Sequence, residues 1–157
     1  MRKILIAVLL GAAFVAAGCS PATTTTTVAT TTSKATTTTA LKADYTTKVA
    51  VKDFAIAPEQ TTLKAGNVEF TVNNTGATIH ELVMIKTDLA VDALPLKAGT
   101  AEVDEEAAGL TVAGEVEEIG PGTTKSNVIE LKPGRYVAIC NLADHYKRGM
   151  RIEITVN

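Results

Sequence analysis

Four side chains in the second half of the chain could together bind a metal ion. His80 and His145 are the two histidines of the sequence, Cys140 is one of its two cysteines, and Met150 is one of three methionines. Two imidazoles, one thiolate and one thioether are the ligand set of a blue-copper electron-transfer site. At equal availability such a site also binds copper more tightly than zinc.

The spacing of these residues fits a single site. His145 lies five residues after Cys140, and Met150 lies five residues after His145. A strand that ends at Cys140 and a strand that begins at Met150 would let one loop wrap the ion, while His80 arrives on another strand. Each residue alone has an ordinary alternative, since a lone buried cysteine is often only a small hydrophobe. The spacing of all four residues together favours a shared metal site over these separate alternatives.

Alternating hydrophobicity predicts the strands that must position these residues. Val68, Phe70 and Val72 alternate with polar residues, which is typical of a half-buried strand. Further strands are expected over residues 48–56, 79–85, 128–131, 136–140 and 150–156, and an inserted loop within 86–120. Seven or eight short strands in about 110 residues predict an all-β, Greek-key β-sandwich.

The N-terminal residues 1–18 resemble a signal peptide. They contain a basic start, an apolar stretch from Ile4 to Val15 that is too short to span a bilayer, and small residues before Cys19. A small residue before a cysteine resembles the lipobox of bacterial lipoproteins, which implies lipidation of Cys19. Ala16 departs from that pattern, because Leu is usual there, and a plain secretory signal is the alternative.

Thr-rich sequence follows the signal peptide. Residues 19–43 offer almost no apolar side chains to bury, so we expect a flexible tether that begins at the lipidated Cys19. Residues 44–157 are then the folded domain. This organisation predicts an extracytoplasmic protein, anchored by lipid to a membrane in the periplasm or at the cell surface.

Composition excludes several functions. Fifteen Lys and Arg stand against 17 Asp and Glu, giving a formal charge of −2, whereas nucleic-acid binding usually requires a basic excess. The sequence shows no phosphate-binding loop and no Ser-His-Asp order. Both histidines are assigned to one copper ion, which leaves none for a multicopper oxidase centre. We therefore expect no enzymatic activity.

The domain resembles the cupredoxin family, which includes plastocyanin, azurin, auracyanin and rusticyanin. The resemblance implies that His80, Cys140, His145 and Met150 bind one type 1 copper ion, with Cys140 the main covalent ligand and Met150 a weak axial one. It rests on segments in each part of the domain: Val51–Phe54, Leu63–Gly66, Val68–Asn73, Asn74–Gly76 with His80–Leu82, Pro133–Tyr136 and Cys140–Met150.

The resemblance also implies a function, which is one-electron transfer by a type 1 copper site. His80 is expected to be the more buried imidazole and His145 the partly exposed edge through which electrons pass. Glu81 departs from the family, because an Asn or Ser follows the first histidine in several members and steadies the cysteine loop. A carboxylate there would favour the more positive copper state and lower the reduction potential.

Two other functions stay open. One is copper binding for storage, delivery or resistance without electron transfer, which the small number of methionines disfavours. The other is a structural module with a vestigial ligand set, which the complete set disfavours more strongly.

The expected partners are redox proteins, and two charged regions could bind them. A basic cluster of Lys147, Arg148 and Arg151 beside the copper loop would suit an acidic partner, and we weigh it above an acidic loop over residues 100–120. That acidic loop would instead suit a basic partner, or be only a solvated surface.

Overall fold

The computed structural model describes residues 41–157. The predicted signal peptide, Cys19 and the tether as far as residue 40 lie outside the described residues. Within 41–157, no helix has the length and apolar character needed to cross a membrane.

The described residues form an all-β sandwich, which confirms the predicted fold class, with nine strands in place of seven or eight. The strands are β1 (Tyr45–Lys52), β2 (Ala55–Pro58), β3 (Thr62–Leu63), β4 (Gly66–Asn74), β5 (His80–Lys86), β6 (Thr111–Ile119), β7 (Thr124–Leu131), β8 (Gly134–Ile139) and β9 (Arg151–Val156).

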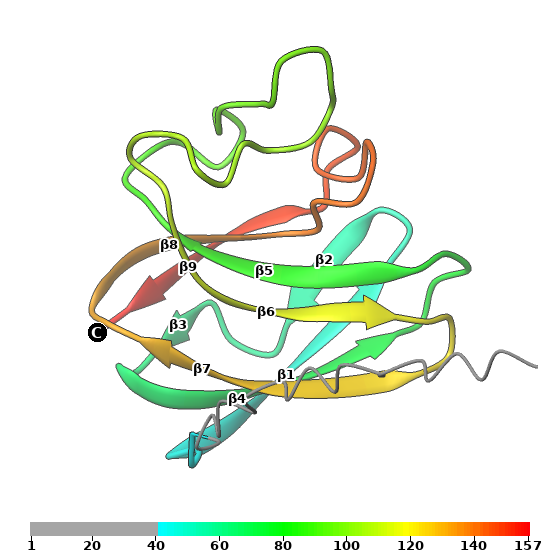
Figure 1. The fold of residues 1–157 in the computed structure, drawn as a ribbon. Helices are drawn as coiled ribbons and strands as arrows, with labels where there is room; N and C mark the ends of the chain where they lie inside the picture. The colour runs from blue at the N-terminus through cyan, green and yellow to red at the C-terminus, as the bar shows by residue number, and fades with distance from the viewer. Residues whose placement is uncertain (1–40) are drawn as a thin grey trace, which may run out of the picture. The chain divides into compact units, whose positions relative to one another are not determined.

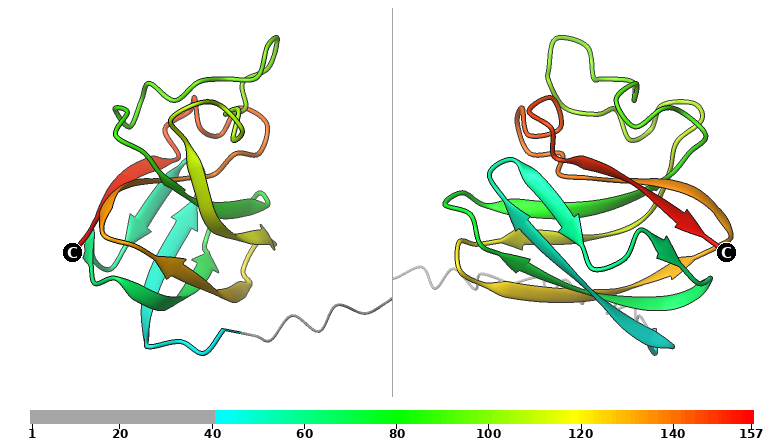
Figure 2. Two further views of the ribbon diagram at one scale, coloured as in Figure 1. Left: turned by 60° about the vertical axis from the view of Figure 1, so that its left-hand side comes forward. Right: turned by 180° about the vertical axis from the view of Figure 1, so that it is seen from behind.

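Two sheets face each other across the core (Figures 1 and 2). One has the strand order β2-β1-β4-β7 and the other the order β3-β9-β8-β5-β6. The sheets are mixed, because β1 pairs in parallel with β4 and β3 pairs in parallel with β9, while the remaining pairs are antiparallel. Strands distant in sequence are thereby brought side by side, which places the last residues of β1 and β8 and the first residue of β5 at one end of the sandwich.

One sequence expectation needs correction, and one strand was not expected. The single strand predicted over 48–56 is two strands, because the chain turns at Asp53–Phe54 between β1 and β2. The loop expected within 86–120 is residues 87–110, and Thr111–Ile119, for which no strand was predicted, is the strand β6, paired with β5. Glutamates at 115, 117 and 118 obscured that strand, since they interrupt the alternation of its apolar residues.

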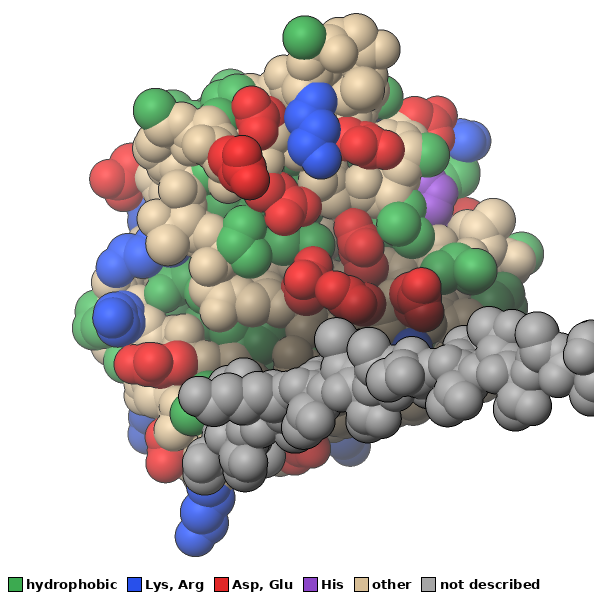
Figure 3. All heavy atoms as spheres, in the orientation of Figure 1, with side chains coloured by type: hydrophobic (Ala, Val, Ile, Leu, Met, Phe, Trp, Pro, Cys, Tyr) green, Lys and Arg blue, Asp and Glu red, His purple; other side chains and the backbone are tan. Residues whose placement is uncertain are grey.

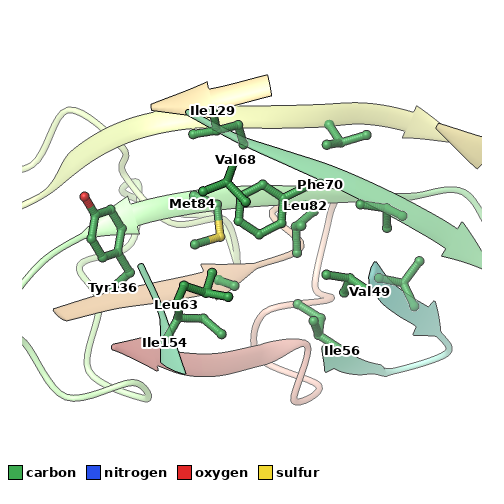
Figure 4. Packing of buried hydrophobic residues seen from close by; sticks show 14 of the residues in the cluster. Val49, Ile56, Leu63, Val68, Phe70, Leu82, Met84, Ile129, Tyr136 and Ile154 are labelled. Atoms are coloured by element: carbon green, nitrogen blue, oxygen red, sulfur yellow. The ribbon is translucent and has the colours of Figure 1, made fainter. Parts of the chain in front are cut away.

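The main core lies between the sheets and is built by alternate residues of each strand. Figure 4 shows these side chains meeting from both sheets. Burial of large side chains such as Phe70 is the principal stabilising term, and truncating Phe70 to Ala would cost about 3–5 kcal/mol. The buried members that Figure 4 labels are Val49, Ile56, Leu63, Val68, Phe70, Leu82, Met84, Ile129, Tyr136 and Ile154.

The segment 87–110 covers the outer face of the second sheet. Val83 and Ile85 of β5, with Val137 and Ile139 of β8, point away from the main core and pack with three residues from outside the sheet. These three are Leu94, Val103 and Tyr146. Both faces of β5 and β8 are therefore buried, so the two strands that lead to the predicted ligands are fixed on both sides.

Candidate metal centre

The predicted ligands meet at one end of the sandwich. His80 is the first residue of β5, Cys140 follows the last residue of β8, and Met150 precedes the first residue of β9. Sγ of Cys140 lies 3.3 Å from Nδ1 of His145 and 3.9 Å from Nδ1 of His80. The three side chains offer one donor atom each within 4.8 Å of one another. The structure thus brings three of the four predicted ligands, His80, Cys140 and His145, together.

These distances suit a bound first-row ion. Bonds of about 2.0–2.3 Å, as nitrogen and thiolate make to zinc, keep two donors of one ion within about 4.4 Å of each other. His80, Cys140 and Met150 are 0% exposed, and His145 is 9% exposed. Cys140 and Met150 belong to the main core cluster, so apolar side chains exclude water from one side of the centre.

The ligand loop 140–150 is closed by its own backbone. The N–H of Cys140 donates to the carbonyl of Met150 (3.1 Å), and the N–H of Met150 donates to the carbonyl of His145 (3.0 Å). The N–H of His145 donates in turn to the carbonyl of Leu142 (2.9 Å). Backbone hydrogen bonds therefore link Cys140 to Met150 and Met150 to His145, which are three of the four predicted ligands.

Asp53, which the sequence did not single out as a site residue, contacts the first histidine. Its Oδ1 lies 2.8 Å from Nε2 of His80. A carboxylate only accepts hydrogen bonds, so Nε2 carries the proton and Nδ1 keeps its lone pair toward Cys140. Hydrogen bonds from Thr78 and the backbone of Ala77 hold the pKa of Asp53 well below its usual range, so it is ionised. No local pattern marks Asp53, which is 27 residues from His80.

Burial also changes the protonation of the ligands themselves. It raises the pKa of the Cys140 thiol, against the opposite effect of hydrogen bonds from the backbone N–H groups of Leu142 and Glu81. It lowers the pKa of His145, and the neighbouring His80 acts in the same direction. Near neutral pH the metal-free centre therefore contains a protonated thiol and a neutral His145 imidazole.

A stack of side chains covers the edge of His145. The ring of Phe54 meets the imidazole edge-on, with the ring centroids 5.0 Å apart. The guanidinium carbon of Arg148 lies over the Phe54 ring, 3.5 Å from the ring centroid. The turn between β1 and β2 thus contacts both histidines, through Asp53 on one side and Phe54 on the other.

Charged side chains of both signs lie near the centre. Figure 3 shows acidic side chains gathered over β6 and the segment before it. The basic cluster is less free than its sequence suggests, because Arg151 donates to the carbonyl of Tyr146 (2.6 Å) and lies over the Tyr146 ring. Arg148 pairs with Asp144 at 3.8 Å as well as stacking on Phe54.

Comparison with known proteins decides the family. The family model of the cupredoxin-like domain matches residues 7–156. The chain belongs to the cupredoxin family. No curated protein matches it. Cupredoxins of solved structure share its fold at low sequence identity.

Auracyanin from Roseiflexus castenholzii is 23% identical, with a TM-score of 0.53 over 74% of this chain and 99% of its own. Auracyanin A from Chloroflexus aurantiacus is 22% identical, with a TM-score of 0.52 over 71% and 98%. An azurin from Methylomonas sp. strain J is 16% identical, with a TM-score of 0.51 over 73% and 99%. The second of these is described as a blue copper protein.

The residues of this cupredoxin fit a type 1 copper ion. A buried thiol and two imidazoles present their donor atoms to one another, and a buried thioether follows in the same loop. His80 begins β5 and Cys140 directly follows β8, and both strands are packed on both faces, so the two donor atoms cannot move far apart. Two histidines, one cysteine and a methionine are the ligand set of blue-copper sites.

Proposed function

We propose that this cupredoxin is a one-electron carrier that uses one type 1 copper ion bound by His80, Cys140, His145 and Met150. When bound, copper supplies the couple between Cu(II) and Cu(I). The observation that carries the proposal is the convergence of Cys140 Sγ and the two Nδ1 atoms in a buried site at one end of the sandwich.

Rigidity is what the protein contributes to such a carrier. An electron passes quickly when the donor atoms need not rearrange. The backbone hydrogen bonds that link Cys140, His145 and Met150 hold the loop closed. Asn141 and Tyr146 attach the same loop to the segment 87–110, through bonds to Val103 and Leu94. The site is thereby braced from outside as well as from the core.

His145 is the proposed edge for electron entry and exit, because it is the more exposed imidazole. Arg148 lies over Phe54, and Phe54 contacts His145. One positively charged residue of the basic cluster therefore lies close to His145. We therefore infer an acidic redox partner at this end of the domain. Steering by opposite charge would raise its association rate and would weaken with salt.

The proposal includes a location. We propose that the chain is exported and held at a membrane by a lipid on Cys19, with the Thr-rich residues as a tether, and that it does not act as an enzyme. The support is the sequence before residue 40. Replacing Cys19 by Ser should move the protein from the membrane fraction to the soluble fraction, and an unchanged distribution would contradict lipidation.

The experiment that tests the copper function is a visible spectrum of the purified chain with Cu(II), followed by a redox titration. We expect an intense thiolate-to-copper band that bleaches reversibly on reduction. Cys140→Ser should abolish the band, and Cys19→Ser, which removes the other cysteine, should leave it intact. Tight copper binding without the band would overturn electron transfer and favour copper storage or delivery.

A further inference from the structure

Asp53 collects three hydrogen bonds at the turn between β1 and β2. Its Oδ1 accepts from the hydroxyl of Thr78 at 2.6 Å and from Nε2 of His80 at 2.8 Å. Its Oδ2 accepts from the backbone N–H of Ala77 at 2.9 Å. Although its side chain is 27% exposed, both of its oxygens are engaged within the protein. The carboxylate therefore has a fixed position relative to the imidazole.

The partners of Asp53 come from a turn that is itself fixed. Asn74 accepts from the N–H of Gly76 at 2.8 Å and donates to the carbonyl of Thr78 at 2.7 Å. The turn also packs tightly, since a Cβ at Gly76 would lie 2.9 Å from Oδ1 of Asp53. Glycine at 76 lets the turn approach Asp53 closely enough to deliver Ala77 and Thr78. The arrangement is built around the carboxylate.

Only a carboxylate satisfies all three donors. An amide at position 53 would direct its NH₂ group either at the N–H of Ala77 or at His80. In the second case Nε2 of His80 would become the acceptor, and the proton would move to Nδ1, the atom that faces Cys140. A carboxylate at 53 therefore fixes the proton on Nε2 and leaves Nδ1 free to bind a metal, whereas an amide does not fix it.

We propose that Asp53 is a positioning residue for the copper centre: it holds His80 in the tautomer that leaves Nδ1 free and strengthens that nitrogen as a donor. The inference rests on the proposed copper function. A carboxylate that accepts the proton of a ligating imidazole makes the imidazole more basic, and removing such a partner typically costs 10–100-fold in metal affinity. A stronger donor favours Cu(II) over Cu(I), so Asp53 lowers the reduction potential.

The test compares Asp53→Asn with the wild-type chain. We expect Cu(II) affinity to fall about 10–100-fold and the ratio of Cu(I) to Cu(II) at a fixed potential to rise at least tenfold, a shift of ~59 mV for one electron. In the metal-free protein, ¹⁵N NMR of His80 should show the proton on Nε2 in the wild type and a smaller fraction of that tautomer in the variant. If Asp53 only supported the fold, replacing it would leave the tautomer of His80 unchanged.

Two further variants make the test specific. Asp144→Asn removes the same charge beside the other histidine without a hydrogen bond to it, and should shift the ratio less than threefold. Thr78→Val removes the donor that shares Oδ1 of Asp53 with His80, so the remaining bond should strengthen and the potential should fall. If Asp53→Asn does not fold, the sign of the Thr78→Val shift decides, and an unchanged or raised potential overturns the proposal.

The two proposals fail in different ways. If the wild-type chain shows no thiolate-to-copper band, the copper function fails, while the tautomer of His80 in the metal-free protein still reports on Asp53. If the wild type is blue and Asp53→Asn keeps its affinity, potential and tautomer, the role of Asp53 is overturned and the copper function stands.

Discussion

The backbone N–H of Asn141 donates a hydrogen bond of 2.9 Å to Oε1 of Glu81. This bond joins the residue after Cys140 to the residue after His80, across 60 positions of the chain. Glu81 therefore steadies the cysteine loop from the position that an Asn or Ser takes in several cupredoxins, and it brings a carboxylate into the neighbourhood of the thiol. Burial raises the pKa of Glu81, with further contributions from the charges of Glu105 and Glu117.

Replacing Glu81 by Gln should raise the reduction potential. The variant keeps the oxygen that accepts from Asn141 but removes a negative charge that favours Cu(II). An interaction on the order of 1 kcal/mol corresponds to a shift of some tens of millivolts, measurable by redox titration at pH 7. Glu130→Gln, on the exposed face of β7, is the matched control. Equal potentials in both variants and the wild type would remove this role.

Tyr146→Phe should destabilise the protein. The hydroxyl of Tyr146 accepts from the N–H of Leu94 and donates to the carbonyl of Val91, each at 3.0 Å. Because Leu94 is buried, its N–H would be left without a partner, at a cost of about 1–3 kcal/mol in urea unfolding. Tyr45→Phe is the control, since its hydroxyl bonds the backbone of Lys64 in the same two ways at an exposed position. Tyr45→Phe should lower the free energy of unfolding by less than about 1 kcal/mol. Similar losses of stability in the two variants would argue that Tyr146 does not fix the ligand loop to the segment 87–110.

Glu115→Gln should stabilise the protein at pH 7 and not at pH 4. Burial and the neighbouring Glu117 raise the pKa of Glu115 to about 6. The protonated form is therefore favoured in the folded state, and the stability it contributes is present below the ordinary pKa and lost as pH rises through about 6. Water screens this half-exposed side chain, so we expect a gain of no more than about 1 kcal/mol at pH 7.

The measurement is thermal or urea unfolding of Glu115→Gln and wild type across that pH range. Glu59→Gln, which removes a carboxylate from an exposed position after β2, is the control. A Glu115→Gln variant that gains the same stability at pH 4 as at pH 7 would show that the effect is not one of protonation.

Copper binding should release about one proton near pH 7. The raised pKa of the Cys140 thiol means that its proton must leave, whereas His145, with its lowered pKa, is already neutral. Apparent Cu(II) affinity should therefore rise about tenfold per pH unit between pH 7 and 8. Calorimetry in buffers of different ionisation enthalpy counts the proton. Cys140→Ser should abolish the release, and release that persists in this variant would contradict the assignment.

The convergence of His80, Cys140 and His145 could be predicted from the sequence more readily than the residues around them. Cys140, His145 and Met150 lie within one loop, so their spacing alone brings them together once the flanking strands are recognised. His80 could be added because it begins a segment of alternating residues. Asp53 gave no such signal, since its contact with His80 depends on the parallel pairing of β1 with β4, which no local pattern encodes.

The strand pattern was also predictable only where one face is apolar. Residues 68–74 and 151–156 alternate clearly and form β4 and β9. The strand β6 was missed, because its buried residues Val116 and Ile119 are separated by glutamates and the ladder with β5 contains register shifts. The segment 87–110 could not be placed from the sequence, since its fixation depends on distant partners such as Asn141 and Tyr146.

The parallel pairing that brings β1 beside β4 also gives the domain a polarity. The described chain reaches β1 at Tyr45 and arrives at Asp53 eight residues later, a path of about 26 Å along an extended strand. Any anchor that precedes residue 41 would therefore hold the domain by the pole remote from the copper ligands. The length of that preceding segment would limit how far the domain can move from its anchor, while the end with the copper ligands stays accessible to a partner. Changes in the length of the segment would then leave the partner-binding surface unchanged.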